Sequence, residues 1–301
     1  MSSSVVKQKR ASLPGWFKTR LPEAGTQAKT FAHTTRSASS LHTVCEEAKC
    51  PNRTSCWSKG TATFMVAGKS CTRSCRFCSV DHLHAPPPPD FDEPARLADA
   101  IAGLKLDYVV ITVVNRDDLP DGGALHYRAC LDAVNAAAPD TGLELLGSDL
   151  AGDEDALALL LDGAPLKVFA HNVETVERLT PNIRDRKASF RVSLRTLEAA
   201  KELRPDLLTK SSLMVGLGES HKDVEQTMRD LRGVGVDLLT LGQYLAPTPR
   251  HYPVLSFPTP AQFDEWKELA LGMGFKAVAS GPLVRSSYHA GDLYREAVEK
   301  I

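Results

Sequence analysis

The chain has 301 residues, of which 43% are hydrophobic and 24% are charged, and its formal net charge is −1. This length fits one large domain or two small ones, with ample apolar material for a core. The balanced charge argues against a protein that binds nucleic acid by neutralising phosphates. No apolar run reaches the ~18 residues of a membrane helix, so we expect no nucleic-acid partner and no membrane span.

The first 40 residues are unusually basic. They carry seven Lys or Arg and one acid, Glu23. We interpret this stretch as a solvated arm, with docking to an acidic protein partner as the alternative. The start of the chain lacks the apolar segment of a secretory signal. Only about a dozen residues precede "LPGWFKTRLP", where we expect ordered sequence to begin, and this is short for an organellar transit peptide. We therefore expect a reducing, bacterial-type cytoplasmic location and leave a mature organellar form open.

Strand and helix patterns then alternate along the chain. Apolar, β-branched runs predict strands at 61–68, 107–114, 143–150, 166–173, 207–217, 237–245 and 277–284. Helical periodicity predicts helices at 93–104, 123–137, 153–163, 188–203, 221–235 and 260–275, and a terminal helix. The proline run at 85–90 predicts a short extended spacer.

This alternation predicts an α/β fold with parallel strands and helical crossovers. The first six strand–helix units fit either a partial (β/α)6 TIM-like barrel or an open doubly wound sheet. In both folds, ligand sites gather beyond the carboxyl ends of the strands. Three notable loops occupy such positions: 71–78, 115–124 and 216–220.

Six of the seven cysteines fall within 34 residues, as one trio at Cys45, Cys50 and Cys56 and another at Cys71, Cys75 and Cys78. The second trio has the spacing C-x3-C-x2-C, which places three thiolates on one tight loop. Such a loop can bind three irons of a 4Fe-4S cluster and leave the fourth iron open. Zinc is the competing interpretation, because structural zinc takes four ligands and two histidines lie nearby, at His82 and His84.

The pattern C-x3-C-x-aromatic-C, with Phe77 as the aromatic residue, resembles the signature of the radical S-adenosylmethionine enzymes. That superfamily has a partial (β/α)6 barrel, and its open iron binds the methionine part of the cofactor. The upstream C-x4-C-x5-C trio narrows the resemblance to the lipoyl synthase family. The likeness continues in "RDDLPDGGA", "HNVET", "KSSLMVGLGE", "LGQYLAPTPRHYPV" and "GPLVRSSYHAG". Two departures, Asn115 and the stretch "LLGSDLAG", concern the substrate side.

The resemblance implies two 4Fe-4S clusters and S-adenosyl-L-methionine as cofactors. Cys45, Cys50 and Cys56 would hold an auxiliary cluster together with a serine of "RSSY". That serine is Ser286 or Ser287, and the resemblance favours Ser287. We expect this segment to be extended, so that the two serines point to opposite faces. A serine oxygen is a poorer iron ligand than a thiolate, which suits a cluster that is dismantled to supply sulfur.

The implied reaction is radical insertion of sulfur at C6 and C8 of an octanoyl chain on a carrier lysine. The implied partners are octanoylated lipoyl carrier domains, namely dehydrogenase-complex acyltransferase subunits and the glycine-cleavage H protein. A reductant such as flavodoxin or ferredoxin and an iron–sulfur carrier for cluster repair complete the set. A methylthiotransferase and a zinc-stabilised binding module are the alternatives.

Several residues are candidates for the cofactor site. Gly122 and Gly123 form either a helix-start turn or a close approach to the methionine amino group. Asn172 and Glu174 are candidates for holding the ribose, with a helix N-cap as the alternative for Asn172. By resemblance, Gly216 belongs to a turn on the adenine side.

Two further residues are interpreted from their surroundings in the sequence. Arg285 is either a hydrogen-bond donor to the auxiliary cluster or a surface cation. Cys130 is expected to be buried and inert, and we expect no metal set among the nine histidines. We divide the chain into an N-terminal extension with the auxiliary cysteines (1–60), a barrel (61–275) and a C-terminal extension with "RSSY" (276–301).

Overall fold

The computed structural model describes residues 13–17, 50, 52–58 and 61–300. Cys45 and most of the basic arm, at 1–12 and 18–40, lie outside the described residues.

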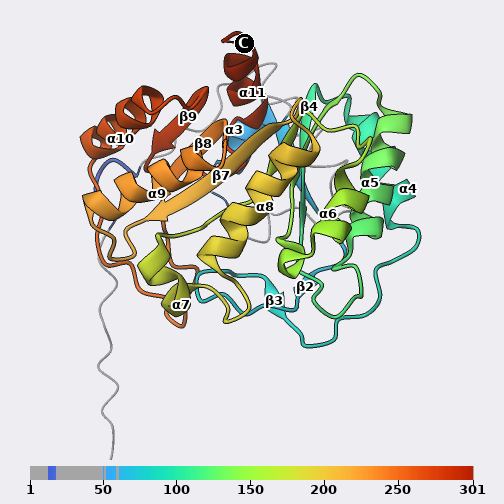
Figure 1. Cartoon of the computed structure of the whole chain (residues 1–301), viewed down its shortest axis with the longest axis horizontal. Coiled ribbons are helices and arrows are strands. Elements are labelled where there is room, and N and C mark those ends of the chain that lie inside the picture. Colours follow the sequence, from blue (N-terminus) through green and yellow to red (C-terminus); the bar gives the residue numbers. More distant parts are fainter. Residues whose placement is uncertain (1–12, 18–49, 51, 59–60, 301) are drawn as a thin grey trace, which may run out of the picture.

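One parallel sheet forms the centre of the molecule (Figure 1). Its strands follow one another in chain order: β1 (Thr61–Val66), β4 (Tyr108–Val113), β5 (Gly142–Leu146), β6 (Val168–Ala170), β7 (Leu208–Val215), β8 (Leu238–Gln243) and β9 (Ala277–Gly281). All seven predicted strands are confirmed. The order of the strands never reverses, whereas in a doubly wound sheet it reverses at the switch point. The sheet stays open between β1 and β9, so the fold is a partial barrel with a seventh strand.

Helices connect the strands on the outer side of the sheet (Figure 1). They are α4 (Glu93–Leu104), α5 (Ala124–Ala137), α6 (Glu154–Leu161), α8 (Phe190–Leu203), α9 (His221–Gly233) and α10 (Pro260–Gly272), with a short α7 (Thr180–Ile183). Helix α7 was not predicted, and the ends of the other six lie within three residues of the predicted ones because capping side chains mark several starts. Ser220 and Asp223 form a capping box at α9, for example. Among the described helices, none is long and apolar enough to cross a membrane.

The terminal helix α11 (Ala290–Val298) fills the amino-terminal end of the barrel interior. Its Leu293 and Ala297 belong to one buried cluster with Val168 and Leu208, which begin β6 and β7. The helix also contacts β4 and β9. The carboxyl ends of the strands, at the other end of the barrel, are therefore the ends available for a ligand.

A buried ion pair crosses the barrel interior between β5 and β7. Lys210 Nζ lies 2.7 Å from Glu144 Oε1, and both side chains are 1% exposed. The Tyr108 hydroxyl donates to the second oxygen of Glu144 at 3.1 Å. Turning either Lys210 or Glu144 outward would leave the other charge buried without its partner. This network therefore fixes both side chains on the inward faces of their strands.

Candidate functional site

A short two-stranded sheet holds the cysteine loop in place. Strand β2 (Ser70–Cys71) pairs with β3 (Asp81–His82), so the loop between them is closed at its base. Within the loop, the Cys78 amide donates to the Cys75 carbonyl at 3.1 Å. The six described cysteines are all free thiols, so none of them forms a disulfide.

Backbone amides point at two of the loop sulfurs. The Asp185 amide donates to Cys75 Sγ at 3.2 Å, and the Arg73 amide donates to Cys71 Sγ at 3.4 Å. Burial raises the pKa of Cys75 to about 11 and that of Cys78 to about 12. A bound cation would favour their thiolate forms, and hydrogen bonds to sulfur are typical of iron–sulfur sites.

The spacing of the loop sulfurs can be compared with the spacing of ligands around one zinc ion. In the described part of the chain, the only trio of metal-binding side chains with ligand atoms within 4.8 Å of one another lies elsewhere. A single zinc ion holds thiolates at about 2.3 Å, and hence less than about 4 Å apart. As they stand, Cys71, Cys75 and Cys78 are not all within 4.8 Å of one another, which is wider than the spacing of thiolates on one zinc ion.

Arg73, inside the cysteine loop, is held by two aspartates from neighbouring loops. Its guanidinium donates to both oxygens of Asp117, which follows β4, at 2.7–3.2 Å. It donates to both oxygens of Asp149, which follows β5, at 2.7 and 2.6 Å. The arginine is buried, so this double clamp fixes the loop against the barrel. None of these three residues was a candidate from the sequence, although Asp117 follows the predicted strand at 107–114 and Asp149 lies near the end of the predicted strand at 143–150.

The two departures from the family pattern contact each other. The Ser148 hydroxyl, within "LLGSDLAG", donates to the side-chain oxygen of Asn115. The Asn115 carbonyl in turn accepts from the amide and the hydroxyl of Thr72, both at 3.0 Å. Asn115 and Ser148, at which the sequence differs from the family pattern, therefore connect the same loops as the Arg73 clamp.

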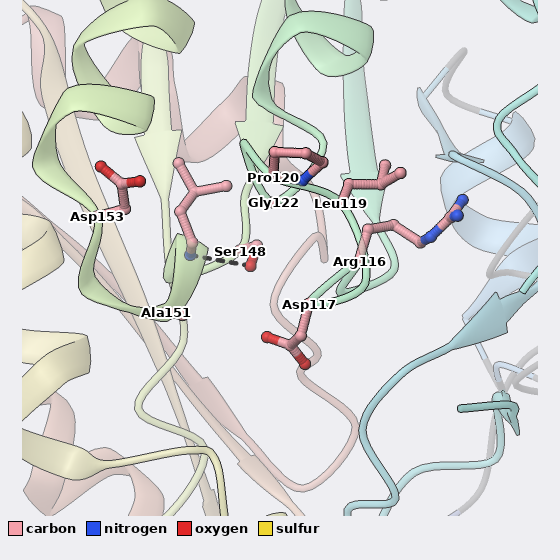
Figure 2. Close-up of a pocket in the computed structure, with 9 residues that line it drawn as sticks. Arg116, Asp117, Leu119, Pro120, Gly122, Ser148, Ala151 and Asp153 are labelled. Atoms are coloured by element: carbon pink, nitrogen blue, oxygen red, sulfur yellow. Dashed lines mark hydrogen bonds between the residues drawn. The ribbon is translucent and has the colours of Figure 1, made fainter. Parts of the chain in front are cut away.

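A cavity of about 230 Å³ opens between the loops that follow β4 and β5 (Figure 2). Its lining comprises Arg116, Asp117, Leu119, Pro120, Gly122, Ser148, Leu150, Ala151 and Asp153. Asp117 lines the cavity and also binds Arg73, so the cavity adjoins the clamp of the cysteine loop.

Gly122 and Gly123 form the turn that begins α5. Their φ angles are +61° and +93°, which favour glycine. A Cβ on Gly122 would lie 3.1 Å from the Leu150 side chain, and one on Gly123 would lie 2.6 Å from the Tyr127 hydroxyl. The helix-start turn is therefore present, and a contact with the cofactor remains a prediction.

Asn172 and Glu174 lie just beyond β6. The N-cap alternative for Asn172 is wrong, because the next helical turn, at Glu177–Leu179, begins after Val176. Instead, the Asn172 amide donates to Glu174 Oε1 at 3.1 Å. Burial raises the pKa of Glu174, and its charge acts on the thiols of Cys75 and Cys78. Glu174 is therefore within electrostatic range of the cysteine loop, and Asn172 is hydrogen-bonded to Glu174.

Gly216 and Phe77 occupy tightly packed positions. The φ of Gly216 is +93°, and a Cβ there would lie 2.1 Å from Gln243 Nε2. Its amide donates to Glu219 at 2.6 Å, which closes the turn after β7. Phe77 is half-buried against the core cluster that includes Tyr244.

The C-terminal segment packs against the helix that carries Cys56, α3 (Arg53–Ser58). The Asn52 side-chain amide donates to the Leu283 carbonyl, although the two residues are 231 positions apart. Ser55 Oγ lies 3.4 Å from a ring nitrogen of His289. The "RSSY" motif between these contacts is thereby brought to the upstream cysteines.

Electrostatic effects are consistent with this placement. Burial lowers the pKa of Arg285, while the charge of Cys50 raises it. Burial raises the pKa of Tyr288, and the charge of Cys56 raises it further. Arg285 is half-buried and donates to the Gln243 and Val284 carbonyls, and the charge of Cys50 acts on it, so it is not an ordinary surface cation.

The prediction of an extended "RSSY" segment is wrong. Residues 286–289 form a turn, in which the Tyr288 amide donates to the Arg285 carbonyl at 3.0 Å. The chain must reverse here to enter α11. Both Ser286 and Ser287 are half-buried, so alternation along a strand does not choose between them.

Comparisons with known proteins agree with this geometry. The family model described as the radical SAM superfamily matches residues 65–231. A mitochondrial lipoyl synthase of Komagataella phaffii is 50% identical over 296 residues, covering 96% of this chain and 70% of that protein. The chain belongs to the lipoyl synthase family of radical SAM proteins. A second member, the mitochondrial lipoyl synthase of Candida tropicalis, is 48% identical and covers 98% of this chain and 78% of its own length.

Solved structures support the fold of this lipoyl synthase family member. Methylornithine synthase aligns with a TM-score of 0.57 at 12% identity, covering 84% of this chain and 78% of its own. The FeFe-hydrogenase maturase HydG from Carboxydothermus hydrogenoformans also gives 0.57 at 13% identity, covering 90% and 61%. At such identities the likeness concerns the barrel alone.

Proposed function

We propose that this protein inserts two sulfur atoms into an octanoyl chain that is amide-linked to a lysine of a lipoyl carrier domain. Sulfur enters at C6 and C8 and gives the lipoyl group. The observation that carries the proposal is the pairing of two separate cysteine sites in one family member. One is the clamped Cys71–Cys78 loop, and the other is the "RSSY" turn beside Cys50 and Cys56.

The target carbons are unactivated, so no side-chain acid, base or nucleophile can deprotonate them. When bound, a 4Fe-4S cluster on Cys71, Cys75 and Cys78 together with S-adenosylmethionine supplies the 5′-deoxyadenosyl radical that removes hydrogen. The protein supplies binding and orientation. Two molecules of S-adenosylmethionine serve the two carbons.

Sulfur comes from a second 4Fe-4S cluster, which is a substrate of the reaction and is consumed unless rebuilt. Cys45, Cys50 and Cys56 hold it with Ser287, and Ser286 is the alternative fourth ligand. We assign Arg285, on which the charge of Cys50 acts, to donating hydrogen bonds to this cluster. A serine oxygen releases iron more readily than a thiolate, which suits a sulfur donor.

Other residues near the cysteine loop position S-adenosylmethionine. We assign Gly122 and Gly123 to the methionine end, and Asn172 and Glu174 to the ribose. Two more residues complete the proposed cofactor-binding set: Phe77, beside the cluster, and Gly216, in the turn on the adenine side. The half-buried setting of Glu174 next to the loop supports its assignment.

The protein partners follow from this reaction. They are octanoylated carrier domains of acyltransferase subunits and the glycine-cleavage H protein, a flavodoxin or ferredoxin, and an iron–sulfur carrier. The relatives named above are mitochondrial, which favours the organellar alternative over a cytoplasmic location. We keep the division at residues 60 and 275, with β9 as the strand by which the C-terminal extension joins the sheet.

The test is anaerobic reconstitution with iron, sulfide, S-adenosylmethionine and a reductant, followed by an octanoyl-lysine peptide. We expect about eight irons per chain and a peptide product heavier by two sulfur atoms. Formation of 5′-deoxyadenosine without any thiolated peptide, at full iron content, would refute the sulfur insertion.

A further inference from the structure

Three metal-binding side chains meet between α4 and α5, outside both cysteine trios. Glu93 is the first residue of α4, and His126 and Cys130 are one turn apart on α5. One ligand atom of each lies within 4.8 Å of the other two. His126 Nε2 lies 2.6 Å from Glu93 Oε2 and 3.8 Å from Cys130 Sγ. This trio includes a histidine, although we expected no metal set among the histidines.

This geometry differs from that of a catalytic cysteine. In a Cys–His–acid arrangement, the thiol and the acid bind opposite nitrogens of the imidazole ring. Here Glu93 and Cys130 both face Nε2 of His126. Three lone-pair donors thus converge on one point, and Cys130 is completely buried.

The distances suit a zinc ion after small side-chain rotations. Zinc binds sulfur at about 2.3 Å and nitrogen or oxygen at about 2.0–2.2 Å, which places tetrahedral ligands roughly 3.3–3.6 Å apart. The observed separations of 3.8 and 2.6 Å lie on either side of that range. The His126 and Glu93 side chains are 15% and 10% exposed, so water can reach a fourth position.

A backbone group already orients one ligand. The Ala67 amide donates to Glu93 Oε2 at 2.7 Å. Such an outer-shell hydrogen bond is a regular feature of metal sites. Ala67 has a φ of +67°, unusual for a residue other than glycine, and it follows β1 four residues before Cys71.

We propose that Glu93, His126 and Cys130 bind one divalent metal ion of the zinc class, with water as the fourth ligand. The i, i+4 spacing on α5 places two ligands on one helix face, and α4 supplies the third. The ion braces the first turns of both helices against the end of β1. It thereby supports the segment that leads into the cysteine loop, and this role is independent of the sulfur-insertion chemistry.

The test uses protein with both iron–sulfur clusters assembled, exposed to zinc chloride and then dialysed anaerobically against zinc-free buffer. Metal analysis should find about one zinc per chain beside an unchanged iron content. Zinc-edge X-ray absorption should show one sulfur at about 2.3 Å and otherwise nitrogen or oxygen neighbours. No retained zinc, or zinc with three sulfur neighbours as on a vacant cysteine trio, would overturn the proposal.

Variants locate the ion. Cys130→Ser and His126→Gln should lose the zinc and keep the iron. The matched control is the double substitution of His82→Gln and His84→Gln, an exposed pair beside the cysteine loop, which should retain the zinc. Equal zinc loss in the control would place the ion at the exposed pair instead. The absorption measurement on the unaltered protein keeps the test decisive if a core variant fails to fold.

Discussion

Arg73 and Asp149 form a bidentate ion pair with distances of 2.7 and 2.6 Å, although they are 76 positions apart. Their side chains are 2% and 0% exposed. Arg73 lies midway between Cys71 and Cys75, while Asp149 follows β5. The pair therefore attaches the cysteine loop to the barrel, and the carboxylate charge offsets the burial of the guanidinium.

Asp149→Asn should destabilise the protein by about 3 kcal/mol, because it leaves the buried guanidinium with one carboxylate fewer. Iron bound by the Cys71–Cys78 loop should fall as well. Anaerobic chemical unfolding and iron analysis measure the two effects. Asp206→Asn, in an exposed pair with Arg204, is the control and should change stability by less than about 1 kcal/mol. Equal losses of stability and iron in the two variants would show that the buried pair matters no more than the exposed one.

His171 makes stability depend on pH. It lies buried between the Gly147 carbonyl and the Ser193 hydroxyl, at 2.9 Å from each. Burial lowers its pKa to about 4, partly opposed by the charge of Asp149, while Arg184 and Arg73 lower it further. In the unfolded chain this pKa is about 6.5. Protons therefore bind the unfolded state first as the pH falls from 6.5 to 4.

The stability due to neutral His171 is complete above pH 6.5 and is lost towards pH 4. The full loss is on the order of 3 kcal/mol. We expect the free energy of unfolding to fall between pH 7.5 and 5 in the unaltered protein. His171→Gln should make this dependence shallower, measured by urea unfolding under anaerobic conditions. The same slope in both proteins would show that another group titrates.

The two cysteine trios should be separable. Cys75→Ala should abolish cleavage of S-adenosylmethionine, because the electron source on that loop is lost. Cys50→Ala should still form 5′-deoxyadenosine but yield no thiolated peptide. Chromatography of the nucleoside and mass analysis of the peptide measure the two products. Normal lipoyl product from Cys50→Ala would mean that sulfur comes from elsewhere.

The serine ligand can be assigned by substitution. Ser287→Ala should keep S-adenosylmethionine cleavage and lose most sulfur insertion, whereas Ser286→Ala should be milder. Ser287→Cys should hold its cluster more firmly and donate sulfur less well, because iron release is hindered. Product yield and iron content should be measured for all three. A severe loss confined to Ser286→Ala would move the ligand by one residue, and full yield from Ser287→Cys would show that a weak oxygen ligand is unnecessary.

The sequence by itself determined the features that depend on neighbours along the chain. Helix α4 has the predicted bounds because its apolar periodicity and its proline near the start are local signals. The spacing of Cys71, Cys75 and Cys78 determined that three thiols share one loop. The positive φ angles at Gly122 and Gly216 also reflect a local preference.

Only the tertiary structure decided how distant segments meet. The unreversed strand order, which separates a partial barrel from a doubly wound sheet, depends on pairing between strands. The contacts of Arg73 with Asp149 and of Asn52 with Leu283 join residues from distant segments. His126 and Glu93 meet because α4 packs beside α5. Such contacts depend on strand register and helix packing, which act across the whole chain and leave no periodic pattern in the sequence.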